Sequence, residues 1–131
     1  MVGPELEAWR AKYRGAGVVG CSGKIYFVPL NAAQVLRIAP QEETVEMVGP
    51  HLRACCKYAG AGAVGSNGKI YFAPYKAARV LCIDPQEETV VMVGPRLAGS
   101  RKYEVAGAVG ANGKIYFAPC SAAQVLCLDP Y

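Results

Sequence analysis

The sequence predicts an all-β fold made of three similar repeats, each with four antiparallel strands. The segment GKIYF occurs three times at an interval of 45 residues, at positions 23–27, 68–72 and 113–117. The chain also contains 15 Gly and 9 Pro among its 131 residues. This content of chain-breaking residues is high for helices and ordinary for short strands joined by turns.

Other segments recur at 45 residues, or at 46 between the first two copies of VGP. VGP recurs at 2–4, 48–50 and 93–95, an Ala-Ala pair recurs from Ala32, Ala77 and Ala122, and PQEETV occupies 40–45 and 85–90. We therefore expect a single repeat domain over residues 1–131, with repeats at approximately 1–47, 48–92 and 93–131, the last one truncated. A period of 40–50 residues with strand-like content is typical of propellers and related arrays.

The middle repeat shows how the first two strands of a unit are expected to form. Residues 60–64 (GAGAV) predict a first strand whose small side chains suit the crowded centre of an array. Asn67-Gly68 is typical of a type I′ hairpin turn. Residues 69–73 (KIYFA) follow as a second strand, rich in the aromatic and β-branched side chains that strands favour.

The third and fourth strands are expected at 79–83 and 89–93. Asp84-Pro85 between them predicts a turn, because the Asp carboxylate can accept a hydrogen bond from a nearby backbone N–H. The second and third strands are apolar on both faces, at residues 70–72 and 80–83. Such strands belong in a sheet covered on both sides, which neighbouring sheets of the same array would provide.

Residues 69–95, KIYFAPYKAARVLCIDPQEETVVMVGP, resemble the four-stranded blade repeat of β-propellers, and in style the kelch-like and YVTN-like repeats. The resemblance extends over nearly the whole chain and implies a partial β-propeller. Two features depart from it. The Gly-Gly pair of true kelch repeats is absent, and the Asp of the IDP turn is Ala39 in the first repeat.

Three blades are fewer than the four to eight of most propellers. The expected arc begins with a stub at residues 1–3, which matches the end of a fourth strand, and stops after a third strand. Its two open faces favour a homodimer that completes a six-bladed ring, or membership of a longer array. A β-trefoil is the alternative, because three repeats of four strands also fit that fold. The single tryptophan, Trp9, and the lack of a repeated Gln-x-Trp count against it.

Motifs that could carry chemistry are interpreted as structural. Residues 15–20 and 60–65 match G-x-G-x-x-G, but a turn and a strand follow them where a dinucleotide site needs a helix. His51 is the sole histidine, so one chain cannot build a multi-histidine metal site. Cys55-Cys56 lacks the C-x₂-C spacing of zinc sites. We expect no catalytic residue, no cofactor and no metal.

Charge separates by loop class, although the net charge is only +4. The loops between repeats and those between second and third strands share one end, which carries ten cations and three acids, a net of +7: Arg10, Lys12, Arg14, Arg53, Lys57, Lys76, Arg79, Arg96, Arg101 and Lys102, with Glu5, Glu7 and Glu104. The hairpin end carries three lysines and seven acids, a net of −4. Arg37, in mid-strand, completes the total.

A basic face attracts an anionic partner. The predicted function is a non-enzymatic propeller-type scaffold for protein–protein interaction, which binds an acidic protein or peptide through Arg53, Lys57, Lys76, Arg79, Arg101 and Lys102. A small-molecule enzyme of a propeller family is the first alternative, weakened because the inner strands offer only Gly, Ala and Val. A trefoil-type carbohydrate binder and a truncated repeat segment without a function of its own are the others. The modest net charge disfavours nucleic acid.

The N-terminal segment MVGPELEAWRAKYR lacks the apolar core of a signal peptide. No apolar run approaches the roughly 18 residues of a membrane helix. We therefore expect a cytoplasmic protein, with no membrane partner and with its six cysteines reduced.

Overall fold

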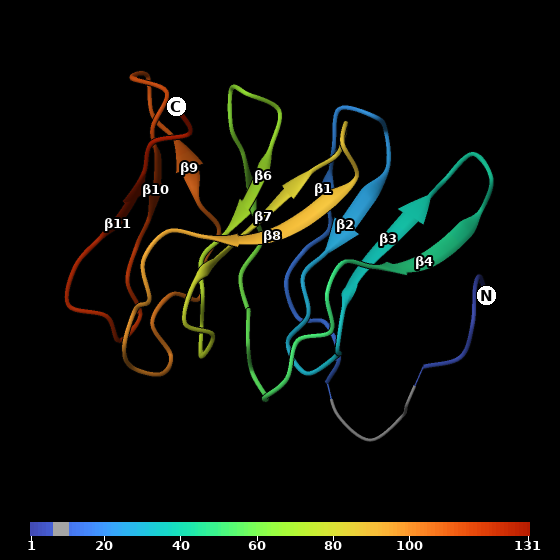
Figure 1. The fold of residues 1–131 in the computed structure, drawn as a ribbon, viewed down its shortest axis with the longest axis horizontal. Helices are drawn as coiled ribbons and strands as arrows, with labels where there is room; N and C mark the ends of the chain where they lie inside the picture. The colour runs from blue at the N-terminus through green and yellow to red at the C-terminus, as the bar shows by residue number, and fades with distance from the viewer. Residues whose placement is uncertain (7–10) are drawn as a thin grey trace.

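The structure is a computed structural model that describes residues 1–6 and 11–131. Within these residues, eleven strands form three antiparallel sheets in chain order (Figure 1). The first sheet contains β1 (Val18–Val19), β2 (Ile25–Phe27), β3 (Val35–Ala39) and β4 (Thr44–Val48). The second contains β5 (Ala63–Val64), β6 (Ile70–Phe72), β7 (Val80–Asp84) and β8 (Thr89–Val93). The third contains β9 (Ala108–Val109), β10 (Ile115–Phe117) and β11 (Leu126–Leu128).

The sheets stand side by side as blades of a partial β-propeller (Figure 1). In each of them, every strand pairs with its neighbour in sequence, and the described ladders stay within one repeat. The predicted all-β propeller architecture is therefore confirmed, and the β-trefoil alternative is set aside. In the part of the chain that the structure describes, no helix has the length and hydropathy to cross a membrane.

The hairpin between β5 and β6 forms where it was predicted, but its turn is of another type. A type I′ turn requires positive φ at both central residues, whereas only Gly68 is positive, at φ +82°. The N–H of Gly68 donates to the carbonyl of Gly65, and the N–H of Gly65 donates to that of Lys69. Asn67 instead uses its side-chain oxygen to accept the N–H of Lys69 at 3.1 Å. The result is a three-residue loop that ends in a left-handed glycine.

The turn predicted at Asp84 is confirmed. Its Oδ1 accepts hydrogen bonds from the backbone N–H of Gln86 at 3.0 Å and of Glu87 at 3.3 Å. Ala39 at the equivalent position in the first repeat cannot make these bonds. The third and fourth strands of that repeat still form a five-residue ladder, from Val35–Val48 to Ala39–Thr44, so the carboxylate supports this turn without being required for the pairing.

Two apolar interfaces hold the three sheets together. The first interface joins Tyr26, Val28 and Val35 of the first sheet to Ile70, Phe72, Leu81 and Ile83 of the second. The second interface joins Tyr71, Val80 and Cys82 of the second sheet to Ile115 and Phe117 of the third. The middle sheet is thus covered on both faces, as its apolar strands predicted, and its β6 is buried at every residue.

A tyrosine in the segment before each sheet fastens that segment to its own blade. The hydroxyl of Tyr13 donates to the carbonyl of Gln34, that of Tyr58 to Arg79, and that of Tyr103 to Gln124, at 2.8, 2.6 and 2.9 Å. Burial raises the pKa of all three phenols, most strongly that of Tyr58. The linkers are therefore anchored parts of the fold, and side chains on them are held in place.

Candidate binding pocket

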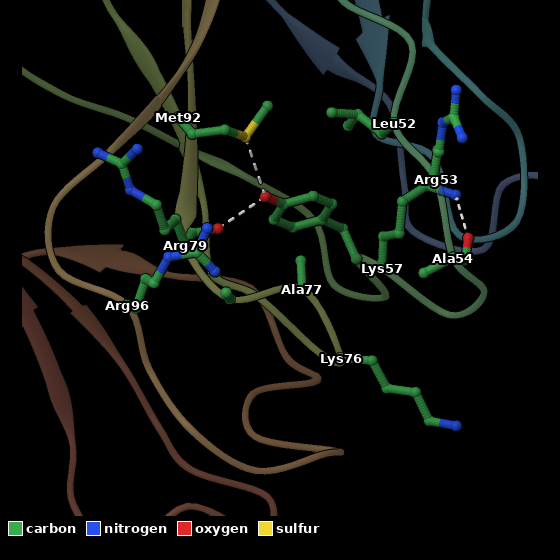
Figure 2. Close-up of a pocket in the computed structure, with 11 residues that line it drawn as sticks. Leu52, Arg53, Ala54, Lys57, Lys76, Ala77, Arg79, Met92 and Arg96 are labelled. Atoms are coloured by element: carbon green, nitrogen blue, oxygen red, sulfur yellow. Dashed lines mark hydrogen bonds between the residues drawn. The ribbon is translucent and has the colours of Figure 1, made fainter.

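A pocket of about 370 Å³ opens at the loop end of the first interface. Its lining comes from residues 52–54 and 57–58 of the linker between the first two sheets, from residues 76–79 of the loop between β6 and β7, and from Met92 and Arg96. Figure 2 shows Arg79 and Arg96 on one side of the pocket and Arg53 on the other. The pocket thus lies where two adjacent blades and the linker between them meet.

The floor of the pocket is apolar, and its polar atoms are satisfied. Leu52, Tyr58, Ala77 and Met92 form it. The Tyr58 hydroxyl lies 2.6 Å from the Arg79 carbonyl and 3.3 Å from the Met92 sulfur (Figure 2). Because these contacts fix the ring, the floor is a preformed apolar surface.

Five cations line the pocket, and its lining contains no carboxylate: Arg53, Lys57, Lys76, Arg79 and Arg96. Four of them are among the predicted partner-binding residues. Arg96 belongs to the predicted basic end but is not among the predicted partner-binding residues, although its place just after the fourth strand is a signal that could have identified it. The other two predicted residues, Arg101 and Lys102, lie in the next linker, outside the pocket.

Lys57 does not present its ammonium group to solvent. The side chain is buried, and its Nζ donates to the carbonyl of Ala54 at 2.8 Å (Figure 2). Lys102, one repeat later, is buried in the same way and donates to the carbonyl of Gly99. Burial lowers the pKa of both amines. Each lysine therefore closes its own linker, and the charge at the surface comes from the other cations.

The four rim cations, Arg53, Lys76, Arg79 and Arg96, remain available for a ligand. Arg53, Lys76 and Arg96 are exposed and Arg79 is partly exposed. The Nε of Arg79 donates to the carbonyl of Gly94 at 2.9 Å, which positions its guanidinium at the rim. Within residues 1–6 and 11–131, the salt bridges involve none of these four. An unneutralised cationic rim in a partly enclosed hollow raises the local potential for anions.

The apolar floor and the cationic rim of the pocket differ in how far they recur at the second interface. Three of the four floor residues recur 45 residues later, since Leu97, Tyr103 and Ala122 follow Leu52, Tyr58 and Ala77, and Met92 has no equivalent in the three-stranded third sheet. The rim does not recur, since Ala98, Ser121 and Gln124 replace Arg53, Lys76 and Arg79. Folding alone does not require these cations, because the second interface forms without them.

The remaining residues of the basic end have different environments. Arg101 is exposed, and its Nε donates to the Tyr75 hydroxyl at 2.9 Å, a bond that raises the pKa of the guanidinium. Arg14 forms an ion pair with Glu104 at 3.5 Å. Glu7 and Arg10, also counted at this end, lie outside the described residues, as does Trp9.

A small cluster of charges at the hairpin end is paired, partly across the first interface. Lys24 contacts Glu88 at 3.1 Å, and Arg37 contacts Glu88 at 3.4 Å and also Glu46. The hydrogen bond and charge of Lys24, helped by Arg37, lower the pKa of Glu88. Near that end, a second hollow of about 280 Å³ is lined by Lys24 and Glu42 among others, so it presents both signs of charge.

Among the side chains that the structure describes, no three His, Cys, Asp or Glu gather in a way that could hold a metal ion. His51 is exposed in the linker between the first and second sheets. In the same linker, Cys56 is partly buried, and its N–H donates to the side chain of Asn31. These residues do not converge on the pocket.

Solved structures of other proteins share this fold, among them three lyase structures. No protein-family model and no curated protein matches the chain. A catalytically inactive variant of virginiamycin B lyase from Staphylococcus aureus, with quinupristin, aligns at TM-score 0.65 and 16% identity over 96% of this chain and 44% of that one. The selenomethionine-substituted virginiamycin B lyase of the same organism aligns at 0.60 and 15%, over 87% and 40%. A streptogramin B lyase aligns at 0.59 and 15%, over the same shares.

The similarity at this level of identity concerns the fold. The chain spans less than half the length of these structures. Its three sheets correspond to part of a longer propeller, which agrees with the blade assignment drawn from the repeats.

Proposed function

We propose that this chain is a non-enzymatic propeller-type binding module that takes up an acidic protein or peptide at the pocket of the first interface. The observation that supports the proposal is the set of rim cations, Arg53, Lys76, Arg79 and Arg96, which surround an apolar floor without a carboxylate among the lining residues. The proposal therefore assigns partner binding to this pocket and not to the whole basic face predicted from the sequence.

The chemistry of the pocket favours an anionic chain with an apolar side chain next to its charges. The rim would attract carboxylates from a distance and orient the partner, because exposed charges act mainly on encounter and specificity. The floor at Leu52, Ala77 and Met92 would take the apolar side chain, whose burial stabilises the complex. Arg79 and Arg53 can each receive a carboxylate in a bidentate manner.

An enzyme is the rival proposal, since the similar solved structures are named lyases. The lining supplies Leu, Arg, Ala, Lys, Tyr and Met. Its one phenol, Tyr58, donates to a backbone carbonyl, and burial raises its pKa, so it is a poor general base. This composition favours binding over acid–base chemistry at the same place.

Two finer points belong to the same proposal. We assign the repeats to the kelch-like or YVTN-like class on the segment at residues 69–95. We also place the protein in the cytoplasm, where the exposed thiols of Cys21, Cys120 and Cys127 would stay reduced.

The test is the affinity for a fluorescent peptide of alternating Glu and Leu, measured by anisotropy. Arg53→Glu with Lys76→Glu should weaken binding by about tenfold or more, which corresponds to about 1.4 kcal/mol. The matched control is Lys69→Glu with Lys114→Glu, which makes the same change of net charge at the hairpin end and should alter the affinity by less than about twofold. Equal weakening by both pairs would mean that net charge, not the pocket, binds the peptide.

A further inference from the structure

We propose that a second copy of this chain completes the third sheet. In this arrangement, Met1 and Val2 of one copy pair antiparallel with Leu126 and Val125 of the other, at the start of β11, as the equivalent residues of β4 and β8 pair in their own sheets. The first sheet of the one copy covers the open face of the third sheet of the other. This inference is independent of the proposed ligand, because it uses other surfaces of the molecule. Its support comes from four observations, each a comparison between equivalent repeat positions.

The first observation is the strand partner that Val125 lacks. MVGP occurs at residues 1–4, 47–50 and 92–95, and in the last two the Met-Val pair ends a fourth strand. There Val48 pairs with Val35, and Val93 pairs with Val80. Val125 is the third valine of that series, and it is 57% exposed where Val35 and Val80 are 1% and 3% exposed. Val2, at 58% exposed, is the residue that would pair with it.

The second observation is the placement of Gly3. A Cβ added to Gly3 would lie 2.6 Å from the Cβ of Val45, and one added to Gly49 would lie 2.6 Å from the Cβ of Val90. Both glycines have positive φ, +79° and +83°. Gly3 therefore contacts the first sheet in the same way that Gly49, just after β4, contacts the second sheet. Residues 1–3 thus occupy the place of the end of a fourth strand in a blade that would lie next to the first sheet.

The third observation is that the chain carries both halves of its own repeated interface at its two ends. Tyr26 and Tyr71, which the next sheet covers, are 1% and 7% exposed, whereas Tyr116 is 37% exposed. On the opposite side, Phe72 and Phe117 are buried against the preceding sheet, whereas Phe27 is only partly buried. The first sheet of a second copy could therefore pack on the open face of the third sheet through the same repeat positions that form the two interfaces within the chain.

The fourth observation is charge. Lys24 pairs with Glu88 across the first interface at 3.1 Å. The equivalent residues at the proposed contact are Lys114 and Glu43 of the second copy, both exposed. Glu43 and Glu88 share a left-handed backbone, with φ +53° and +58°. Docking in the repeat geometry brings these opposite charges together.

One residue makes the contact between copies different from those within the chain. At Gly15 and Gly60 the linker of the next repeat approaches very closely. A Cβ added to either glycine would lie 2.7 Å from a backbone oxygen of that linker. Val105 occupies the equivalent position in the third repeat. The contact between copies must therefore be wider beside this residue. Two such contacts, related by a two-fold axis, would close a ring of six blades, within the usual range for propellers.

The first experiment is the mass of the chain by sedimentation equilibrium. The wild-type protein should have twice the 13.9 kDa mass of one chain. Val125→Asp should give the single-chain mass while keeping the circular dichroism spectrum, because Val125 is exposed and a charge there would prevent strand addition. The control Val64→Asp, at an exposed valine of the middle sheet, should keep the doubled mass.

A wild-type protein of single-chain mass would overturn the proposal. A doubled mass that survives Val125→Asp would do so as well, because that dimer would use another surface. Peptide binding by Val125→Asp should equal that of the wild type, so this result and the failure of the proposed function can be told apart.

The second experiment locates the contact. Val2→Cys combined with Val125→Cys should give a disulfide between chains on mild oxidation, because directly paired antiparallel residues lie within the Cα separation that a disulfide needs. Each single variant provides the background from the exposed Cys21, Cys120 and Cys127. Mass mapping must place the bond between positions 2 and 125, and cross-linking no greater than in the single variants would contradict the proposal. Val105→Gly should tighten the association, and a weaker association would contradict the proposed alignment.

Discussion

The two interfaces between the sheets use the same repeat positions in their cores and differ at their ends. Both bury Val, Ile and Phe from adjacent blades, and both are anchored by a linker tyrosine, Tyr58 or Tyr103. The first interface adds a pocket with cations at one end and an ion cluster at the other. The second has Cys82 in place of Arg37, and Ser121 and Gln124 in place of Lys76 and Arg79.

The comparison distinguishes the core residues that pack neighbouring blades from the surface cations that occur at the first interface alone. The residues common to both interfaces are sufficient to pack neighbouring sheets. The cations at the first interface are additions to that pattern, and they gather in one pocket. A repeat protein can thus carry a specific site without altering its packing, because the rim lies on loops while the core lies on strands.

The largest expected effect comes from the shared core. Leu81→Ala removes a fully buried side chain from the first interface and should lower the free energy of unfolding by about 2–5 kcal/mol. In the single-chain variant Val125→Asp, Leu36→Ala at the equivalent and partly exposed position of the first sheet should cost clearly less. Urea unfolding midpoints measure both losses in that background. Equal losses there would mean that Leu36 is as well packed as Leu81 without a second copy.

A smaller effect concerns the tyrosine anchors. Burial holds the pKa of Tyr58 above its ordinary value of 10, so the folded chain keeps this proton where the unfolded chain loses it. Its contribution to stability is therefore complete below pH 10 and decreases as the pH rises beyond that value. Tyr58→Phe should cost about 1 kcal/mol at neutral pH, through the lost bond to the Arg79 carbonyl.

Tyr58→Phe should also reduce the decrease in melting temperature that occurs at alkaline pH. Melting temperatures between pH 8 and 11 provide the measurement, with Tyr103→Phe as the comparison at the second interface. Tyr58→Phe should reduce the alkaline loss more than Tyr103→Phe, because burial shifts the pKa of Tyr58 more strongly. An unchanged alkaline slope in Tyr58→Phe would show that this anchor does not control the loss.

The smallest effect is expected from the ion cluster. Glu88→Gln removes the partner of both Lys24 and Arg37, but exposed ion pairs contribute little and are screened by salt. The variant should melt slightly earlier than the wild type at low ionic strength, and the difference should vanish at high salt. Because Lys24 and Arg37 lower the pKa of Glu88, the difference should also shrink as acid protonates this carboxylate. A large loss that persists in high salt would assign Glu88 a packing role.

The architecture could be predicted from the sequence. The period of 45 residues indicates an array of similar sheets, and strands that are apolar on both faces indicate that each sheet packs against neighbours on both sides. The turn type at Asn67-Gly68 could not, because a three-residue loop and a two-residue turn use the same dipeptide and differ in where the ladder begins. Of the candidate site, the loop end and four of the pocket cations were predictable from the order of strands and loops.

The environment of the lysines lay beyond such reasoning. In the sequence, Lys57 and Lys102 are loop lysines like Lys76. In the structure, however, each of their amines donates a hydrogen bond to the carbonyl of the residue three positions earlier. Their exact 45-residue spacing, together with the tyrosine that follows each, was the available signal of a structural role. The equivalents of Lys76 in the other repeats are Asn31 and Ser121, so the three repeats require no common side chain at this position.

The most direct test of the central claim is to map the bound acidic peptide by backbone amide chemical shifts. We predict that the perturbed amides lie at residues 52–58, at 76–79 and around Met92 and Arg96, and that the matching positions Ala98, Ser121 and Gln124 of the second interface are unaffected. Perturbations spread equally over both interfaces, or centred on the hairpin end, would contradict this prediction.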